Sequence, residues 1–382
     1  MPGTPILAVL TAAGTGRQQP SYTPKVVLVN LVDWKFAVTA GHRLVRPGPL
    51  TTRQEARDVV ADLRTLAMEA DRVVLDFTGL DAGDAEPVRV VDRKRWITAN
   101  VDGFRFLLEP LLKKLAERRP PSVTALNLGP KVTGAQIGMI LAYLSQRVLG
   151  QYEIFLPPGQ GAGRLTLVAP NIVEIERELG VDPHDFRMWV CLHEAAHRVQ
   201  FTANPWLRDH LRNEIDEFLA ATDLDPAAML KRLRSVATVV GQTVRGNKDV
   251  NFLEAVQTEE QKAILERVTA VMSLLEGHGE YVMNHVDAAV VPSSEDIHRK
   301  FDARRHQARS TDRVIRQLFG LDMKMRQYAE GSDFVSAVVD RVGMDGFNTV
   351  WQGPHTLPTR AEITDPDAWV ARVLGADRLP SS

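Results

Sequence analysis

The residues best placed to do chemistry are two histidines with a carboxylate between them, in the segment Leu192-His193-Glu194-Ala195-Ala196-His197-Arg198. On a helix, His193 and His197 lie on one face and one turn apart, close enough to bind the same tetrahedral metal ion. Glu194 would then lie beside the metal, where a carboxylate can take a proton from water. A lone buried histidine is more often just hydrogen-bonded in a core. The pair with Glu194 in register instead predicts a catalytic Zn²⁺ site.

The residues around this motif predict a buried helix over 183–203. Asp182 and Pro183 are typical of an N-cap and a first helical residue. From there, apolar residues recur every three or four positions on the face that carries the histidines, so this face is expected to point into the interior. Cys191 lies on the other side of the helix from His193 and is expected to be a core residue rather than a ligand.

A catalytic zinc site needs a third protein ligand and one open position. We expect this ligand from a second helix, predicted over 257–289, whose apolar face continues through Glu276. His278 is an alternative, but it lies about 200° around the helix from Glu276, so both cannot face one metal. We therefore predict that His193, His197 and Glu276 bind the metal.

Three residues near Glu276, namely Gly277, Gly279 and Glu280, also have predicted roles. Gly277 and Gly279 weaken a helix, and a helix keeps such glycines where another backbone must come close. Glu280 lies one turn beyond Glu276 on the same face. We expect it to accept the outer N–H of a ligating histidine, the alternative being a solvated carboxylate at the edge of the helix.

The predicted reaction is metal-assisted hydrolysis of a peptide or a small amide. Glu194 would take the proton of the attacking water and pass it to the leaving amine. The oxyanion would need one more donor, for which Tyr281, Tyr328 and His355 are candidates by residue type, with packing as the alternative role of each. A different class of function is a non-enzymatic zinc scaffold or accessory protein, which would hold its metal with four protein ligands.

These motifs resemble those of known families. Glu276-Gly277-x-Gly279-x-Tyr281 is similar to the segment that supplies the third zinc ligand of the gluzincin metallopeptidases, with Gly279 in place of the usual alanine. More closely, the chain resembles a mainly actinobacterial zincin-like family associated with hydrolases and with coenzyme F420 biosynthesis. This resemblance implies a zincin fold and a zinc site over nearly the whole chain, and no particular substrate. It is carried by Val32-Asp33-Trp34, Asp92-Arg93-x-x-Trp96, Gly163-Arg164-Leu165-x-Leu167-Val168-Ala169-Pro170-Asn171, Trp189-x-x-x-His193-Glu194-x-x-His197-x-x-Gln200-Phe201, Pro205-Trp206-Leu207, Lys324-x-x-Gln327-Tyr328 and Leu357-Pro358-Thr359.

Composition narrows the class of protein only slightly. The formal net charge of −2 shows no excess of basic residues of the kind that nucleic-acid-binding proteins have. The single cysteine excludes an internal disulfide and fits a reducing compartment. The apolar run at 5–13 is too short to span a bilayer and has no Lys or Arg before it. We therefore expect a cytoplasmic protein with no membrane or nucleic-acid partner, and the sequence leaves its oligomeric state open.

The elements that must position these residues are mostly helices. Helical periodicity also recurs at 53–71, 94–118, 133–149, 206–221, 226–240, 311–319, 332–342 and 366–374. Two short strands, 152–156 and 165–168, flank a glycine-rich turn just before the histidine helix. The predicted fold is therefore mainly α (α+β), a zincin-like helical fold with a small β-hairpin or sheet beside that helix. We expect an N-terminal tail (1–24), a helical N-terminal region (25–150), a catalytic core (151–290) and a helical C-terminal region that packs on the core (291–382).

Overall fold

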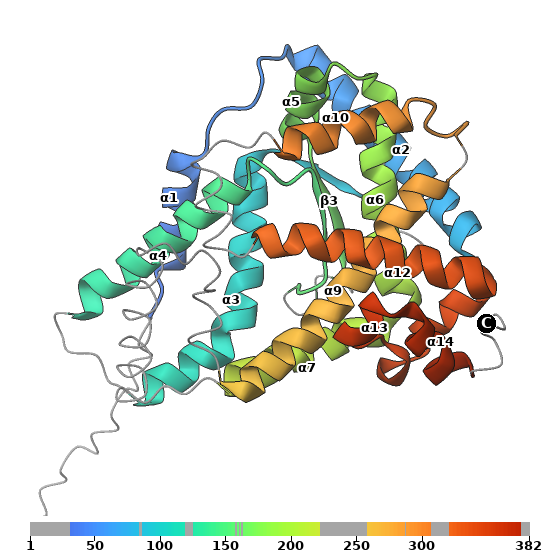
Figure 1. Ribbon diagram of the computed structural model, residues 1–382. Coiled ribbons are helices and arrows are strands. Elements are labelled where there is room, and N and C mark those ends of the chain that lie inside the picture. Colours follow the sequence, from blue (N-terminus) through green and yellow to red (C-terminus); the bar gives the residue numbers. More distant parts are fainter. Residues whose placement is uncertain are drawn as a thin grey trace, which may run out of the picture.

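The computed structural model describes residues 31–83, 86–118, 125–156, 159, 161, 163–221, 258–286, 288–306 and 321–375. In this part of the chain the fold is mainly helical with one small sheet, as predicted (Figure 1). The predicted tail and the helices expected at 226–240 and 311–319 lie outside the described residues. Among the helices described, none is both long and apolar enough to cross a membrane.

Most predicted helices are present, but the one expected at 53–71 extends to Thr78, and the one expected at 332–342 is part of a longer helix, Leu321–Phe347. The helix predicted at 133–149 begins before Pro130 and ends at Leu144. The periodicity did not separate out the helices Trp34–Leu44, Ala169–Leu179, Ser294–His306 and Arg360–Thr364. The helices are α1 (Trp34–Leu44), α2 (Arg53–Thr78), α3 (Arg93–Arg118), α4 (Ala125–Leu144), α5 (Ala169–Leu179), α6 (Pro183–Ala203), α7 (Pro205–Ala220), α9 (Glu259–His285), α10 (Ser294–His306), α12 (Leu321–Phe347), α13 (Arg360–Thr364) and α14 (Pro366–Leu374), with 3-10 turns η2 (Asn348–Trp351) and η3 (Pro354–Thr356).

The sheet contains the predicted hairpin and one further strand. Strands β2 (Gly150–Glu153) and β3 (Arg164–Val168) are antiparallel, with Gly150 opposite Leu167. The strand β1 (Arg89–Val91) pairs in parallel with the other side of β3, which gives the order β1-β3-β2. Three residues are too short a run to show strand periodicity, and so the sequence did not indicate β1. β2 starts two residues earlier than predicted and lies at an edge of the sheet.

The helix α6 runs through the main core. Asp182 accepts a hydrogen bond from the backbone of Asp185 (3.0 Å), and Pro183 is the first helical residue, as predicted. On the face away from the histidines, Arg198 pairs with Asp71 of α2 at 2.5 Å, and both side chains are buried. Because breaking a buried ion pair leaves a desolvated charge, this contact fixes α6 against α2.

The helix α9 begins with a capping box formed by Thr258 and Gln261 and crosses both α6 and α12 (Figure 1). Its crossing with α12 is unusually close at two glycines. A β-carbon on Gly277 would lie 2.1 Å from the backbone carbon of Gly331, and one on Gly331 would lie 2.0 Å from the carbonyl oxygen of Ser273. The expected close backbone approach at Gly277 is therefore present, and the approaching helix is α12.

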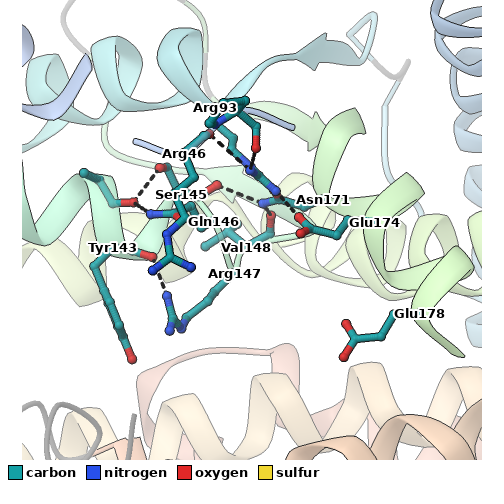
Figure 2. Close-up of polar contacts among 12 residues, drawn as sticks. Arg46, Arg93, Tyr143, Ser145, Gln146, Arg147, Val148, Asn171, Glu174 and Glu178 are labelled. Atoms are coloured by element: carbon teal, nitrogen blue, oxygen red, sulfur yellow. Dashed lines mark hydrogen bonds and ion pairs between the residues drawn. The ribbon is translucent and has the colours of Figure 1, made fainter. Parts of the chain in front are cut away.

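A buried polar network fixes the turn that leads into β2 (Figure 2). The side-chain amide of Asn171, at the start of α5, donates to the carbonyl oxygens of Ser145 (2.8 Å) and Val148 (2.6 Å). Arg93, at the start of α3, donates to the amide oxygen of Asn171 at 2.6 Å and pairs with Glu174. Buried carbonyl groups need such partners, so this network determines where β2 begins.

Candidate metal centre and active site

The structure brings the three predicted metal ligands together. His193 and His197 project from α6, and Glu276 projects from α9 where the two helices cross. The two Nε2 atoms are 3.2 Å apart, and each lies 3.6 Å from Oε2 of Glu276. Within the described part of the chain these residues form a group of histidine and carboxylate atoms that could hold a metal ion.

The dimensions of this triangle fit a metal ion. Ligand atoms at about 2.0–2.1 Å from a tetrahedral metal lie about 3.3–3.4 Å from one another, and the observed separations bracket that value. Two nitrogens and one carboxylate oxygen are also a donor set typical of catalytic zinc, which keeps a fourth position open.

The Glu276 carboxylate interacts electrostatically with both histidines of the centre. Burial acts to raise the pKa of this carboxyl, but hydrogen bonding to His193 and His197 and their charge hold it well below its ordinary value. Burial likewise acts to lower the pKa of His197, and Glu276 overrides it and raises the pKa to about 9. Without metal, Glu276 is therefore a carboxylate paired with a cationic His197, and a metal ion that binds there displaces a proton.

The outer nitrogen of His197 is held by Gln200, one turn further along α6. Its Nδ1 lies 3.0 Å from Oε1 of Gln200. The outer Nδ1 of His193 is buried and has no hydrogen-bond partner among the described residues. The prediction that Glu280 accepts one of these N–H groups is therefore wrong. An oxygen of Glu280 instead lies 3.7 Å from Nε2 of His298 on α10, and both side chains line the cavity.

His278 points away from the metal centre, as the helical geometry predicted. Its ring is fully buried and stacks on Phe347, with centroids 5.5 Å apart, and its edge meets Trp351. Nδ1 of His278 lies 2.9 Å from Nε2 of Gln200. Burial lowers the pKa of His278 to about 3, with a smaller contribution from the charge of His197. The ring is therefore neutral at physiological pH.

Glu194 lies beside the three ligands on α6 and is 6% exposed. Burial raises the pKa of its carboxyl group above the ordinary value, partly opposed by the charges of His193 and His197. Its carboxyl group packs against the first residue of β2, where a β-carbon on Gly150 would lie 2.5 Å from Cδ of Glu194. A raised pKa makes this carboxylate a stronger proton acceptor than an exposed one, which suits a general base beside a metal centre.

The metal centre opens into a cavity of about 570 Å³, large enough for a small ligand. The predicted ligands and Glu194 all line it, and the edge strand β2 forms one wall. The other walls come from α6, α9 and α10, with Leu211 of α7 and the residues 147–149 that precede β2. The further lining residues are Arg147, Val148, Leu149, Gly150, Gln151, Tyr152, Ile154, Trp189, Val190, Phe201, Leu211, Met272, Leu275, Glu280, Met283, His298, Phe301 and Asp302.

Two of the three residues proposed from sequence as oxyanion donors, Tyr281 and His355, do not line the cavity. Tyr281 is buried and stacks on His285 at 3.9 Å, and His355 is exposed with its carbonyl bonded to Arg372. Tyr281 therefore packs in the interior and His355 lies at the surface, rather than serving as oxyanion donors. The side chain of Tyr328 lies outside the described part of the chain. A polar group that sequence reasoning missed is His298, which lines the cavity with its Nε2 3.7 Å from Glu280 and from Asp302.

Cys191 is fully buried in the main core, as predicted. Burial raises the pKa of its thiol, so the sulfur stays protonated. A buried thiol of this kind is an inert core residue rather than a metal ligand or a nucleophile.

The chain belongs to the family of zincin-like metallopeptidases, which it matches over residues 32–370. It is also similar to the crystal structure of a candidate hydrolase with a novel fold from Chloroflexus aurantiacus. The two are 31% identical with a TM-score of 0.65, and the similarity covers 91% of this chain and 100% of that chain. Among curated proteins, none matches. The family confirms the zincin-like resemblance and implies a bound metal, and both comparisons support a hydrolase as the general class.

Proposed function

We propose that the protein is a zinc-dependent hydrolase that cleaves peptides or small amides, with Glu194 as its general base. The observation that supports this most is the triangle of His193, His197 and Glu276 with the Glu194 carboxyl group beside it in the wall of one cavity. Three protein ligands with a carboxylate at this position are the arrangement of a catalytic rather than a closed structural zinc site.

When bound, zinc supplies Lewis acidity that acidifies an attacking water and polarises the carbonyl group under attack. Glu194 accepts the proton of that water and then donates it to the leaving amine; burial raises its pKa above the ordinary value, which makes it a stronger proton acceptor than an exposed carboxylate. Gly150 contributes by leaving space for the Glu194 carboxyl group at the cavity wall.

A peptide is supported as the substrate by the edge strand. β2 pairs only with β3 in the described sheet, and its residues from Gly150 to Tyr152 line the cavity. An extended peptide can add to such an edge by backbone hydrogen bonds, which would place a peptide bond next to Glu194. Small amides would use the same centre without this pairing.

The alternative class is a non-enzymatic zinc scaffold or an accessory protein associated with coenzyme F420 metabolism. A scaffold needs a fourth protein ligand to close its zinc site. The metal group found among the described residues has three members, and the cavity opens beside it, which favours the hydrolase.

The test is to measure hydrolysis of a peptide library and a set of small amides by the zinc-loaded protein, the metal-stripped protein and zinc-loaded Glu194→Gln. We expect activity that requires zinc and falls by about two or more orders of magnitude in Glu194→Gln, with zinc content and fold unchanged because the amide is isosteric. Full activity in the zinc-loaded variant would remove Glu194 from the mechanism. A zinc content of one per chain with no zinc-dependent turnover of either substrate class would favour the scaffold.

A further inference from the structure

The side-chain amide of Gln200 lies between the two helices that build the metal centre, and Gln200 is fully buried. Its Oε1 is 3.0 Å from Nδ1 of His197 on α6. Its Nε2 is 2.9 Å from the carbonyl oxygen of Leu275 and 2.9 Å from Nδ1 of His278, both on α9. One amide group therefore joins a metal ligand of α6 to the backbone residue that precedes the metal ligand of α9.

The carbonyl oxygen of Leu275 determines which way this amide faces. A carbonyl oxygen can only accept hydrogen bonds, so the atom of Gln200 next to it must be the NH₂ group. The amide oxygen then faces His197, and an amide oxygen also only accepts. Nδ1 of His197 must therefore carry a hydrogen and donate it to Gln200.

This assignment sets the state of the other ring nitrogen. A histidine that binds a metal is neutral and carries one hydrogen, so with Nδ1 protonated the lone pair of metal-bound His197 would be on Nε2, the atom that faces His193 and Glu276. With the amide turned round, its oxygen would oppose the Leu275 oxygen and its NH₂ would donate to Nδ1 of His197. The hydrogen of His197 would then move to Nε2, and the metal ligand would be lost.

We propose that Gln200 is a positioning residue for the metal. Its NH₂ group donates to the Leu275 carbonyl oxygen, and this hydrogen bond turns the amide so that it fixes the tautomer and the ring orientation of His197. The inference rests on the metal-binding part of the proposed function and does not depend on hydrolysis. It applies to His197 alone, because Nδ1 of His193 is buried and has no hydrogen-bond partner among the described residues.

The test measures zinc affinity by competition with a chelator, together with the melting temperature of the zinc-free protein. Gln200→Leu removes the acceptor and should weaken zinc binding about 10–100-fold, the usual effect of losing a partner of a metal-bound histidine. Gln200→Glu keeps an acceptor for Nδ1 of His197. It should melt at a lower temperature because it buries a charge next to the Leu275 carbonyl, yet bind zinc at least as tightly as the natural protein.

A matched control separates this role from simple destabilisation. Val199→Ala removes buried methyl groups beside Gln200 without touching the amide, so it should lower the melting temperature and leave zinc affinity unchanged. The inference is overturned if folded Gln200→Leu binds zinc as tightly as the natural protein, or if Gln200→Glu loses affinity. If Gln200→Leu does not fold, the Gln200→Glu result alone decides. Because no substrate is used, failure here is distinct from failure of the hydrolase assignment.

Discussion

Glu194 and Gly150 are in direct contact: the carboxyl group of the expected base rests against the backbone of the first residue of the edge strand. A β-carbon at position 150 would lie 2.5 Å from Cδ and 2.6 Å from Oε1 of Glu194, whereas non-bonded carbon atoms prefer about 3.5–4.0 Å. The position of the base is thus set by a glycine that is far from it in sequence.

Gly150→Ala should therefore displace Glu194 while leaving the three metal ligands in place. We expect zinc content to stay at the natural level and hydrolysis to fall at least about tenfold, since a misplaced proton acceptor costs rate rather than metal. Metal analysis and steady-state kinetics on the same samples measure both. Gly83→Ala is the control, because a β-carbon there meets nothing within 4 Å. Unchanged kinetics in Gly150→Ala would mean that Glu194 is not confined by this contact.

The second helix offers a direct test of the ligand set. Glu276→Ala removes one of three metal bonds and should cost most of the bound zinc. His278→Ala should keep the zinc, since its ring faces Phe347 rather than the metal. Glu280→Ala should also keep it, in contrast to the expectation from sequence, because Gln200 holds the outer nitrogen of His197. Zinc content per chain is the readout, and an empty His278→Ala beside a full Glu276→Ala would refute the assignment.

The two glycines that follow Glu276 should respond very differently to alanine. A β-carbon on Gly277 would meet the backbone of Gly331 at 2.1 Å, and a backbone cannot turn aside as a side chain can. Gly277→Ala should lower the free energy of unfolding by about 3 kcal/mol or more. A β-carbon on Gly279 would instead touch Nδ1 of His193 at 3.4 Å, an ordinary contact, so Gly279→Ala should fold normally. Urea unfolding of both variants compares them, and equal losses would show that the α9–α12 crossing is not the constraint.

Local periodicity was enough to predict that His193, His197 and Glu276 face one another. His193 and His197 share a helical face by their spacing, and the angle between Glu276 and His278 decided which of the two faces inward. The hairpin beside α6 was predicted on the same basis, since alternation and turn residues lie within one short segment. In each case the information is contained within two or three helical turns or one hairpin.

What the sequence did not indicate depends on contacts between distant segments. Gln200 lies on the inward face of α6, yet its role follows only from the position of Leu275 on α9. Gly150 matters because the Glu194 carboxyl group occupies the space that a side chain at position 150 would fill. The short strand β1 forms by pairing with β3, which is more than 70 residues away in sequence. Glu280 was assigned to a histidine N–H by its place on the helix, and the packing of α10 gave it a different partner.

The buried His278 should make the fold sensitive to acid. Burial lowers its pKa in the folded protein to about 3, against about 6.5 in an unfolded chain. Between these two values the unfolded chain binds a proton that the folded protein does not, so stability falls as the pH falls through this window and is fully present above about 6.5. The largest loss attributable to this one group is on the order of 5 kcal/mol.

His278→Leu, which stays neutral at every pH, should therefore lose less stability than the natural protein when the pH is lowered from 7.5 to 4.5. Urea unfolding of the zinc-free proteins at both pH values gives the comparison, and the absence of zinc keeps metal release out of the measurement. His184→Gln, at an exposed histidine, should lose as much stability as the natural protein. Equal losses in His278→Leu and the natural protein would mean that burial against Phe347 and Trp351 does not hold His278 neutral.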